Sequence, residues 1–423
     1  MNDRLVVLIG DHVAGELRRD RRNQLEFAYD EDYRSRRDPT PLSLSMPVQV
    51  QRHADDSVTP WLWGLLPDND RVLRRWAERF QVSAGSPFGL LASPVGLDCA
   101  GAVRFVRESG LAEAAQRDGA IRWLTDAQVA ERLRELQRDT SAWLGADFTG
   151  RFSLAGAQAK TALVYQDGRW GLPEGAEATS HILKPAITGF DDHDLNEHLC
   201  LRAASLLGLP VVRTELVRVA GQSAVAIQRY DRARRPGRTR VRVHQEDVCQ
   251  ALGLHPSMKY QAEGGPGPAD VAALLRRVMP AGAASDAVWR FADALLWNWV
   301  IAGTDAHAKN YSLLLQGGQV RLAPLYDIAS ALPYAHERDL KMAMKLGGDY
   351  RLHVQRAGTW TTLASDLGVE ADRLCDRATR LAAGAPGAFA KAADEVADLG
   401  SDLPPRLVGA VAGRAERCAR TID

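Results

Sequence analysis

The order of secondary-structure patterns along the chain constrains its fold more than any single motif does. Residues 151–244 contain short apolar runs separated by glycine turns, which is the pattern of β-strands. Residues 245–423 have apolar residues at helical spacing over most of their length. One exception, YSLLLQGGQVRL at 311–322, predicts a strand, a Gly-Gly turn and a second strand. A strand-rich half followed by a helix-rich half with one late hairpin predicts an α+β fold with two lobes.

The first third of the chain predicts an additional small module. Three short apolar runs within residues 4–30 predict a meander, and NDRVLRRWAERF at 69–80 predicts a helix. Glycine and proline crowd residues 83–96, which predicts a loop. Thr125 is the expected N-cap of the next helix. The predicted segments are an N-terminal mixed α/β subdomain (1–115), a connecting helix and linker (116–150), a strand-rich lobe (151–244) and a helical C-terminal lobe (245–423).

Composition and charge exclude several classes of protein. Apolar residues make up 46% of the 423 residues and charged residues 25%, which excludes wholesale disorder. The 53 Lys and Arg balance the 53 Asp and Glu, so nucleic-acid binding would need a local basic patch or a basic partner. The five cysteines form no C-x-x-C pair, which supports neither a disulfide framework nor a zinc site. The charged N-terminus is not a signal peptide and no stretch suits a bilayer, so we expect a cytoplasmic protein.

The segment GTDAHAKN at 303–310 is the sharpest chemical signal. Asp305 lies five positions before Asn310, the D-x-x-x-x-N spacing of a protein-kinase catalytic loop. In that loop the aspartate accepts the proton of the attacking hydroxyl, and the asparagine holds a metal that bridges the nucleotide phosphates. The alternative is an ordinary helix end, because Thr304 and Asp305 are also common capping residues.

Three further residues extend this pattern. Asp327 follows the predicted hairpin, where a kinase places its second magnesium ligand, although it could also cap a turn. Lys184 in HILKP could reach phosphate oxygens, with Glu197 on the next predicted helix as its ion-pair partner. The alternative for Lys184 is an edge-strand lysine in water.

Two other segments have competing interpretations. SLAGAQAKT, with one glycine at Gly156, is a candidate phosphate-binding loop, but without context a hairpin corner explains it as well. The run from Arg232 to Arg242 holds six arginines. It could bind an acidic protein or nucleic acid, but an exposed, solvated hairpin is the expected outcome.

Taken together, these motifs resemble the HipA family of bacterial serine/threonine kinase toxins from type II toxin–antitoxin systems. The resemblance extends over almost the whole chain, in the family's order. The matching segments are PLSLSMP (41–47), GLLPDN (64–69), RFSLAGAQAKTAL (151–163), SHILKP (180–185), Asn196 with Glu197, QEDVCQALGL (245–254), SMKYQAEGGPG (257–267), GTDAHAKN (303–310), APLYDIASA (323–331) and DLKMAMKLG (339–347).

The resemblance implies a two-lobed, protein-kinase-like fold with an extra N-terminal subdomain, and ATP and Mg²⁺ as cofactors. It implies Asp305 as the catalytic residue, and Asn310 and Asp327 as the metal ligands. Ser153 matches the serine that similar kinases phosphorylate on themselves. The implied ATP-binding residues are Ala155, Gly156, Ala157, Gln158, Ala159, Lys160, Lys184, Gln228, Arg229, Tyr230, His307, Ala308, Lys309, Asn310, Tyr326 and Asp327. Family members often have an acidic residue at the position of Gln228, in the hinge beside the adenine.

The family also implies partners. These are a HipB-like helix-turn-helix antitoxin, operator DNA reached through the complex with that antitoxin, and a protein substrate such as an aminoacyl-tRNA synthetase, with the glutamyl enzyme favoured. Residues 359–372, where DNA-facing residues would be sought, contain no Lys or Arg. We therefore expect this chain alone not to bind operator DNA at physiological salt, and to join the complex only when the antitoxin is present. Two alternatives stay open: a small-molecule kinase of the same fold, and a catalytically silent corepressor.

Overall fold

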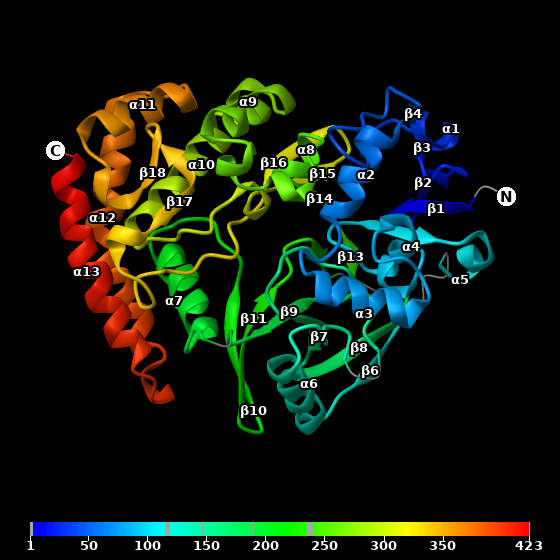
Figure 1. The fold of residues 1–423 in the computed structure, drawn as a ribbon, viewed down its shortest axis with the longest axis horizontal. Coiled ribbons are helices and arrows are strands. Elements are labelled where there is room, and N and C mark those ends of the chain that lie inside the picture. The colour runs from blue at the N-terminus through cyan, green and yellow to red at the C-terminus, as the bar shows by residue number, and fades with distance from the viewer. Residues whose placement is uncertain (1–2, 115–118, 146–147, 188, 235–239, 423) are drawn as a thin grey trace. The chain divides into compact units, whose positions relative to one another are not determined.

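The computed structural model describes residues 3–114, 119–145, 148–187, 189–234 and 240–422 (Figure 1). The chain forms two compact units. Unit 1 comprises Met1–Pro185, Val217–Pro256 and Ser312–Val320, and unit 2 comprises Ala186–Leu216, Ser257–Tyr311 and Arg321–Asp423. Each unit is therefore built from segments that are distant in sequence.

Unit 1 begins with an antiparallel sheet of order β4-β3-β2-β1-β5. The strands are β1 (Asp3–Ile9), β2 (His12–Arg19), β3 (Leu25–Tyr29), β4 (Arg52–His53) and β5 (Val103–Val106). The helices of this region are α1 (Glu31–Arg34), α2 (Asp55–Gly64), α3 (Asp70–Phe80), α4 (Pro87–Leu91) and α5 (Leu111–Ala114). The predicted meander and the helix at 69–80 are confirmed.

The expected loop or interdomain segment at 83–96 is wrong for Pro87–Leu91, which form the short helix α4. Ser86 caps α4 by accepting a hydrogen bond from the Gly89 backbone N–H, and Pro87 occupies its first turn. Phe88, Leu90 and Leu91 are buried in the core of unit 1. The glycine and proline content hid this apolar helix because composition reports turn chemistry and not burial.

A second sheet of unit 1 has the order β10-β11-β9-β7-β8-β6. Its strands are β6 (Gly119–Trp123), β7 (Thr161–Gln166), β8 (Arg169–Gly175), β9 (His181–Pro185), β10 (Thr214–Val219) and β11 (Gln222–Gln228). Helix α6 (Asp126–Arg138) packs against β9 and β11, and Thr125 caps it with Gln128 as a reciprocal capping box. The chain crosses between the units within β10.

One hydrophobic cluster of unit 1 joins two regions that the sequence prediction separated. It includes Leu5 and Phe27 of the first sheet, Trp76 of α3, Trp143 after α6, and Ala162 of the second sheet. The remaining elements are β12 (Arg232–Ala233), β13 (Val241–Arg242), β14 (His244–Asp247), α8 (Val248–Ala251), β15 (Ser312–Gln316) and β16 (Gln319–Leu322). The domain boundaries drawn from the sequence stay predictions, and the first of them falls at residues 115–116, outside the described residues.

Unit 2 is mainly helical. Its elements are α7 (His193–Leu206), α9 (Pro268–Val278), α10 (Ala281–Ile301), β17 (Lys341–Leu346), β18 (Asp349–Arg351), α11 (Ala357–Leu367), α12 (Ala371–Asp394) and α13 (Leu403–Ile422). Helix α10 is buried over most of its length, and α12 packs on α7, α10, α11 and α13. The β15–β16 hairpin is confirmed, whereas the β17–β18 hairpin was not anticipated. None of the described helices is both long and apolar enough to cross a membrane.

Candidate active site

The loop after α10 is shaped by two residues with special backbone requirements. Ala302 adopts a left-handed conformation (φ 54°), and the Gly303 backbone N–H donates to the Asn298 carbonyl at 2.7 Å. A Cβ on Gly303 would lie 2.2 Å from the buried Asn298 side-chain oxygen, so this position strongly favours glycine. The buried helix therefore ends sharply, and the segment GTDAHAKN starts from a fixed point.

Within this loop, Asp305 and Asn310 are held together by the peptide backbone. The Asn310 Nδ2 donates to the Asp305 carbonyl at 2.7 Å, and the His307 backbone N–H donates to the same oxygen at 2.8 Å. With its amide nitrogen used in this way, Asn310 keeps its amide oxygen as an available ligand. The D-x-x-x-x-N spacing thus produces a closed loop with defined side-chain orientations.

The Asp305 carboxylate is exposed, and a tyrosine holds it. The Tyr260 hydroxyl donates to Asp305 Oδ1 at 2.6 Å. The Tyr260 ring also contacts the His307 ring edge to face, with centroids 4.9 Å apart. Tyr260 lies in SMKYQAEGGPG, and the Ala308 backbone N–H donates to the Lys259 carbonyl at 3.1 Å. No spacing rule connects these two motifs in the sequence, because α9 and α10 separate them.

His307 is buried at the centre of this loop. Burial lowers the pKa of its imidazole, and the positive charges of Lys259 and Lys309 lower it further, whereas Asp305 and Asp327 raise it. Among the described residues, its Nδ1 atom has no hydrogen-bond partner. Burial therefore favours the neutral form of the His307 imidazole.

Asp327 also lies in unit 2, where hydrogen bonds of the nearby Ser330 fix the segment that follows it. The Ser330 hydroxyl donates to the Ile301 carbonyl at 2.6 Å, and the Asn196 side chain of α7 exchanges two hydrogen bonds with the Ser330 backbone. Asp327 itself has a left-handed backbone (φ 58°), a strained conformation of the kind that clusters at functional sites. The Tyr326 hydroxyl donates to the Lys309 carbonyl at 2.7 Å. Asn196 is a positioning residue, whereas the sequence singled it out only as part of a matching motif.

The chemistry of these donors fits a magnesium ion. An amide oxygen from Asn310 and a carboxylate from Asp327 are hard ligands, and Mg²⁺ typically takes one or two protein groups together with phosphate and water. The described residues contain no cluster of three or more His, Cys, Asp or Glu that could hold a metal by themselves. The pair therefore suits a metal that arrives with a nucleotide.

In unit 1, a hydrogen bond connects the two ends of the candidate phosphate loop at 155–160. Gly156 has a left-handed backbone (φ 96°), and the Lys160 ammonium donates to the Ala155 carbonyl at 2.7 Å. The Asp68 backbone N–H donates to the Gly156 carbonyl at 3.0 Å, and Asn69 Nδ2 donates to the Ala157 carbonyl at 3.3 Å. GLLPDN thus supports this loop, a link that the separate motifs did not reveal.

The residues of the predicted ion pair and the serine predicted to be self-phosphorylated are all buried. Lys184 lies on β9 with 4% of its surface exposed, opposite Val225 of β11, so the alternative of an edge lysine in water is wrong. Glu197 is fully buried in α7 of unit 2, and its pairing with Lys184 stays a prediction. Ser153 is also fully buried, and its hydroxyl donates to the Leu65 carbonyl at 2.8 Å.

The three hinge residues differ in what their side chains do. Gln228 is exposed at the end of β11, and the Tyr230 hydroxyl donates to the Gln245 side chain. The Arg229 side chain is buried and forms a bidentate ion pair with Asp231, at 3.0 and 2.8 Å. A nucleotide contact by Arg229 would therefore involve its backbone, and the hinge role stays a prediction.

The arginine run at 232–242 is solvated only in part. The side chain of Arg234 is 61% exposed, whereas those of Arg232, Arg240 and Arg242 are only 1, 7 and 8% exposed. Residues 235–239 of the run lie outside the described residues. Arg232 pairs with Asp98 at 2.8 Å, and Arg240 pairs with Glu177 at 2.9 Å. The carboxylates come from segments far away in sequence, which is why the run alone suggested solvent.

Comparisons with known proteins agree with this architecture. The family model of the HipA N-terminal domain matches residues 5–106, and that of the HipA-like C-terminal domain matches residues 152–389. A protein named Y4mE from Sinorhizobium fredii is 35% identical over 408 residues, covering 96% of each chain. The serine/threonine-protein kinase toxin HipA of Shewanella oneidensis is 29% identical over 396 residues, covering 90% of this chain and 88% of that protein.

A solved structure is similar over nearly the whole fold. The Shewanella oneidensis HipA chain, in a complex with HipB and operator DNA, superposes with a TM-score of 0.83 at 26% identity and covers 98% of this chain and 97% of that one. The fold is therefore that of a two-lobed, α+β, kinase-like protein with an additional N-terminal subdomain. The chain belongs to the HipA family, and the expected fold class and the class of enzyme, a serine/threonine kinase, are confirmed.

Proposed function

We propose that the chain is an ATP- and magnesium-dependent protein serine/threonine kinase that acts as the toxin of a type II toxin–antitoxin system. The observation that carries this proposal is the exposed Asp305 carboxylate, held by Tyr260 and fixed to Asn310 through its own carbonyl. A general base must be accessible to the hydroxyl that it deprotonates, and Asp305 meets this requirement.

Each part of the site has a distinct task in this reaction. Asp305 accepts the proton of the substrate hydroxyl as the hydroxyl oxygen forms a bond to the γ-phosphorus of ATP, while the bond from that phosphorus to the β,γ-bridging oxygen breaks and ADP leaves. Asn310 and Asp327 would hold Mg²⁺, which neutralises the charge that develops on the phosphate oxygens. Lys184 and the loop at 155–160 would bind phosphate oxygens, and the hinge at 228–230 would contact the adenine. His307 to Lys309 and Tyr326 complete the nucleotide pocket.

The proposed partners follow from the family. The HipA of Shewanella oneidensis forms a complex with HipB and operator DNA, which supports an equivalent assembly for this chain. A HipB-like helix-turn-helix antitoxin would neutralise the toxin and bring it to operator DNA. The proposed substrate is a translation component such as an aminoacyl-tRNA synthetase, with the glutamyl enzyme favoured. Its phosphorylation would stall growth, and these events would take place in the cytoplasm.

Self-phosphorylation of Ser153 would require a conformational change. Its hydroxyl is fully buried against the Leu65 carbonyl, and a phosphate carries about −1.5 to −2 charges. Such a group cannot remain in that position, so the modified segment would leave its place beside the 155–160 loop. Peptide mass spectrometry after incubation with ATP and magnesium tests this, and an active enzyme without phosphate on the Ser153 peptide contradicts it.

The deciding experiment compares the chain with its Asp305→Asn variant in a whole-cell lysate containing radiolabelled ATP. We expect a labelled protein band that only the active chain produces, and mass spectrometry identifies the modified serine or threonine. Label that appears in a small molecule, and not in protein, would instead establish a small-molecule kinase. Equal labelling by the two chains would exclude the proposed role of Asp305.

A further inference from the structure

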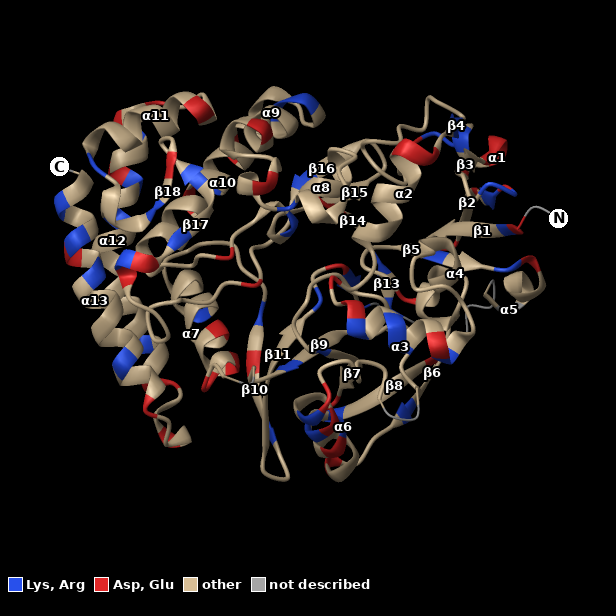
Figure 2. Cartoon of the chain, viewed as in Figure 1, with Lys and Arg blue, Asp and Glu red and all other residues tan. Residues whose placement is uncertain are grey.

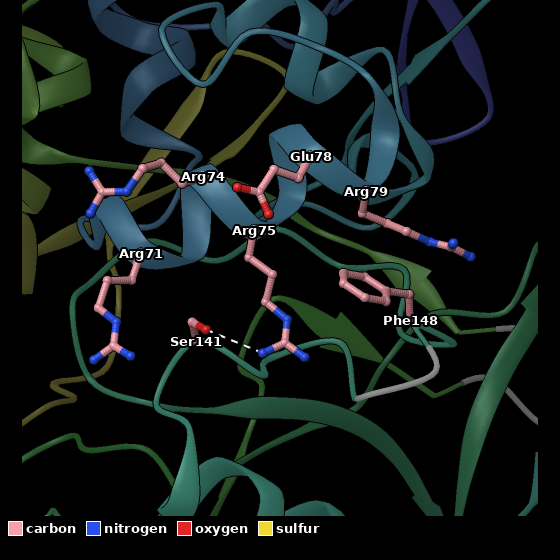
Figure 3. Close-up of a pocket in the computed structure, with 7 residues that line it drawn as sticks. All are labelled: Arg71, Arg74, Arg75, Glu78, Arg79, Ser141 and Phe148. Carbon is pink, nitrogen blue, oxygen red and sulfur yellow. Dashed lines mark hydrogen bonds between the residues drawn. The ribbon is translucent and has the colours of Figure 1, made fainter.

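A row of arginines lies along one face of α3 in unit 1 (Figure 2 and Figure 3). With a serine and a phenylalanine from the segment that follows α6, they line an open pocket of about 710 Å³. The lining residues are Arg71, Arg74, Arg75, Glu78, Arg79, Ser141 and Phe148. The opposite face of α3 is apolar and buried, with Val72 and Trp76 in the core of the unit. The arginines therefore point outward because the helix is amphipathic.

Most of this positive charge is not neutralised within the protein. Arg71, Arg74 and Arg79 make no side-chain hydrogen bond or ion pair with a described residue, although many other arginines of the chain are paired. Among the described residues, the acidic groups at the pocket are Glu78 on α3 and Asp139, which pairs with Arg75. Of the groups that the structure describes there, four are guanidinium groups and two are carboxylates. The pocket is a local basic patch on a chain whose net charge is zero.

Two of the guanidinium groups are already oriented. The Arg75 Nη1 atom pairs with Asp139 and donates to the Ser141 hydroxyl at 3.3 Å, as Figure 3 shows for Ser141. The guanidinium carbons of Arg75 and Arg79 lie 5.3 and 5.2 Å from the centre of the Phe148 ring. The aromatic ring therefore restricts both side chains, which lowers the entropic cost of binding a ligand there.

The dimensions of the row indicate the class of ligand. From Arg71 to Arg79 the helix rises about 12 Å, and successive phosphates of a nucleic-acid strand advance about 3.4 Å along the axis, so the row spans between three and four steps and matches about four phosphates. The planar guanidinium fork binds phosphate oxygens in pairs. The sequence predicted no direct DNA contact by this chain alone, and the arginine row revises that expectation. We propose that this face of α3 binds the phosphodiester backbone of a nucleic acid, independently of the catalytic loop and of any antitoxin.

The test measures binding of the purified full-length chain to labelled oligonucleotides by fluorescence anisotropy. The probes are a single-stranded RNA, a DNA of the same sequence, the corresponding duplex and a polyglutamate peptide, over about 50 to 200 mM salt. We expect binding to the nucleic acids that weakens steeply with salt. Preference for RNA or for DNA would identify the source of the backbone, while the shared phosphate chemistry predicts that at least one of them binds.

Variants place the binding on α3. Arg71→Ala/Arg74→Ala should weaken binding roughly tenfold or more and reduce the salt slope by about 1.4 for a single strand. Arg277→Ala/Arg321→Ala removes the same charge from two exposed arginines elsewhere and should leave binding nearly unchanged. Glu78→Gln removes a repulsive carboxylate and should tighten binding.

Three results would overturn the proposal. The first is absence of oligonucleotide binding at about 50 mM salt, and the second is an equal loss in the α3 and control pairs. The third is tight binding of polyglutamate with none of the nucleic acids, which would assign the row to an acidic protein. Circular dichroism establishes that the variants are folded, and Glu78→Gln, which predicts a gain, does not depend on a loss that misfolding could mimic.

Discussion

A buried carboxylate in unit 1, Asp98, and an exposed carboxylate in unit 2, Asp305, differ in their surroundings and in the role that each can have. In unit 1, Asp98 is buried and accepts hydrogen bonds from Arg232 and from the backbone and hydroxyl of Thr179. In unit 2, Asp305 is exposed, and among the described residues its carboxylate accepts one side-chain hydrogen bond, from Tyr260. A buried carboxylate with several charged partners cannot exchange protons readily, whereas an exposed one can.

This contrast separates residues that stabilise the fold from residues that act in catalysis. A buried cluster of ion pairs connects β12 and β13 to Asp98. Its members are Asp98, Arg229, Asp231, Arg232 and Arg242. Its arginines lower the pKa of Asp98 and outweigh the burial that would raise it. We therefore expect substitutions in this cluster to reduce stability, and substitutions around Asp305 to reduce activity without loss of stability.

The largest expected effect is on catalysis. Asp305→Asn should reduce kinase activity by about 10²–10⁴-fold, because the amide cannot accept the substrate proton. The side chain is exposed, so the midpoint of thermal unfolding should stay close to that of the unchanged chain. Asp286→Asn, an exposed substitution on α10, is the matched control and should retain activity. Growth arrest by a folded Asp305→Asn variant would contradict the catalytic role of Asp305 and with it the contrast to Asp98.

The second prediction concerns the buried cluster. Asp98→Asn should destabilise the chain by about 3–5 kcal/mol, because it leaves buried arginines without their compensating charge. Asp349→Asn removes a carboxylate that pairs with Arg351 at the surface, and it should leave the unfolding midpoint unchanged. Urea unfolding followed by tryptophan fluorescence measures both. Equal midpoints for the Asp98 variant and the unchanged chain would show that the cluster is not a scaffold.

The third prediction concerns the pH dependence of stability that the buried Glu246 carboxyl of unit 1 produces. Glu246 accepts hydrogen bonds from the Ser43 hydroxyl at 2.5 Å and from the Leu44 backbone N–H at 2.8 Å, and burial raises its pKa to about 8. The unfolded chain releases this proton at a pKa of about 4.3, whereas the folded chain keeps it. Stability from this group is therefore complete below that pH and declines by about 1.4 kcal/mol per pH unit as the pH rises towards the folded pKa.

Glu246→Gln tests this decline. The amide oxygen can accept from the Leu44 N–H and the amide nitrogen can donate to Ser43, while no proton is lost at any pH. Urea midpoints between about pH 5 and about pH 8 should fall for the unchanged chain and fall less for the variant. Parallel pH profiles for the two chains would contradict the assignment of a protonated buried carboxyl.

Local features could be predicted well from the sequence, and long-range pairing poorly. The α10 end, the GTDAHAKN loop and the β15–β16 hairpin follow from spacing within a few residues, and the structure has all three. Arg232 and Asp98 are 134 residues apart, Arg240 and Glu177 are 63 apart, and the Tyr260–Asp305 hydrogen bond spans 45 residues. Contacts between side chains that are distant in the sequence leave no periodic pattern in it. The sequence therefore predicted a solvent-exposed arginine run and did not indicate a role for Tyr260.

The smallest effect we predict is also the most specific to the geometry of the catalytic loop. Tyr260→Phe keeps the ring against His307 and removes only the hydroxyl that donates to Asp305 Oδ1. We expect kcat to fall about tenfold, which corresponds to about 1.4 kcal/mol, with little change in the KM for ATP.

Tyr350→Phe provides the control for this last variant. Its hydroxyl makes no hydrogen bond with a described residue, so kcat should be unchanged. A purely structural role for Tyr260 would lower the unfolding midpoint and the amount of active enzyme without lowering the kcat of the enzyme that stays folded. A Tyr260→Phe enzyme with an unchanged kcat per folded molecule would therefore show that the hydroxyl does not act on the Asp305 carboxylate, and the distinction between a buried scaffold carboxylate in unit 1 and a positioned, exposed carboxylate in unit 2 would fail.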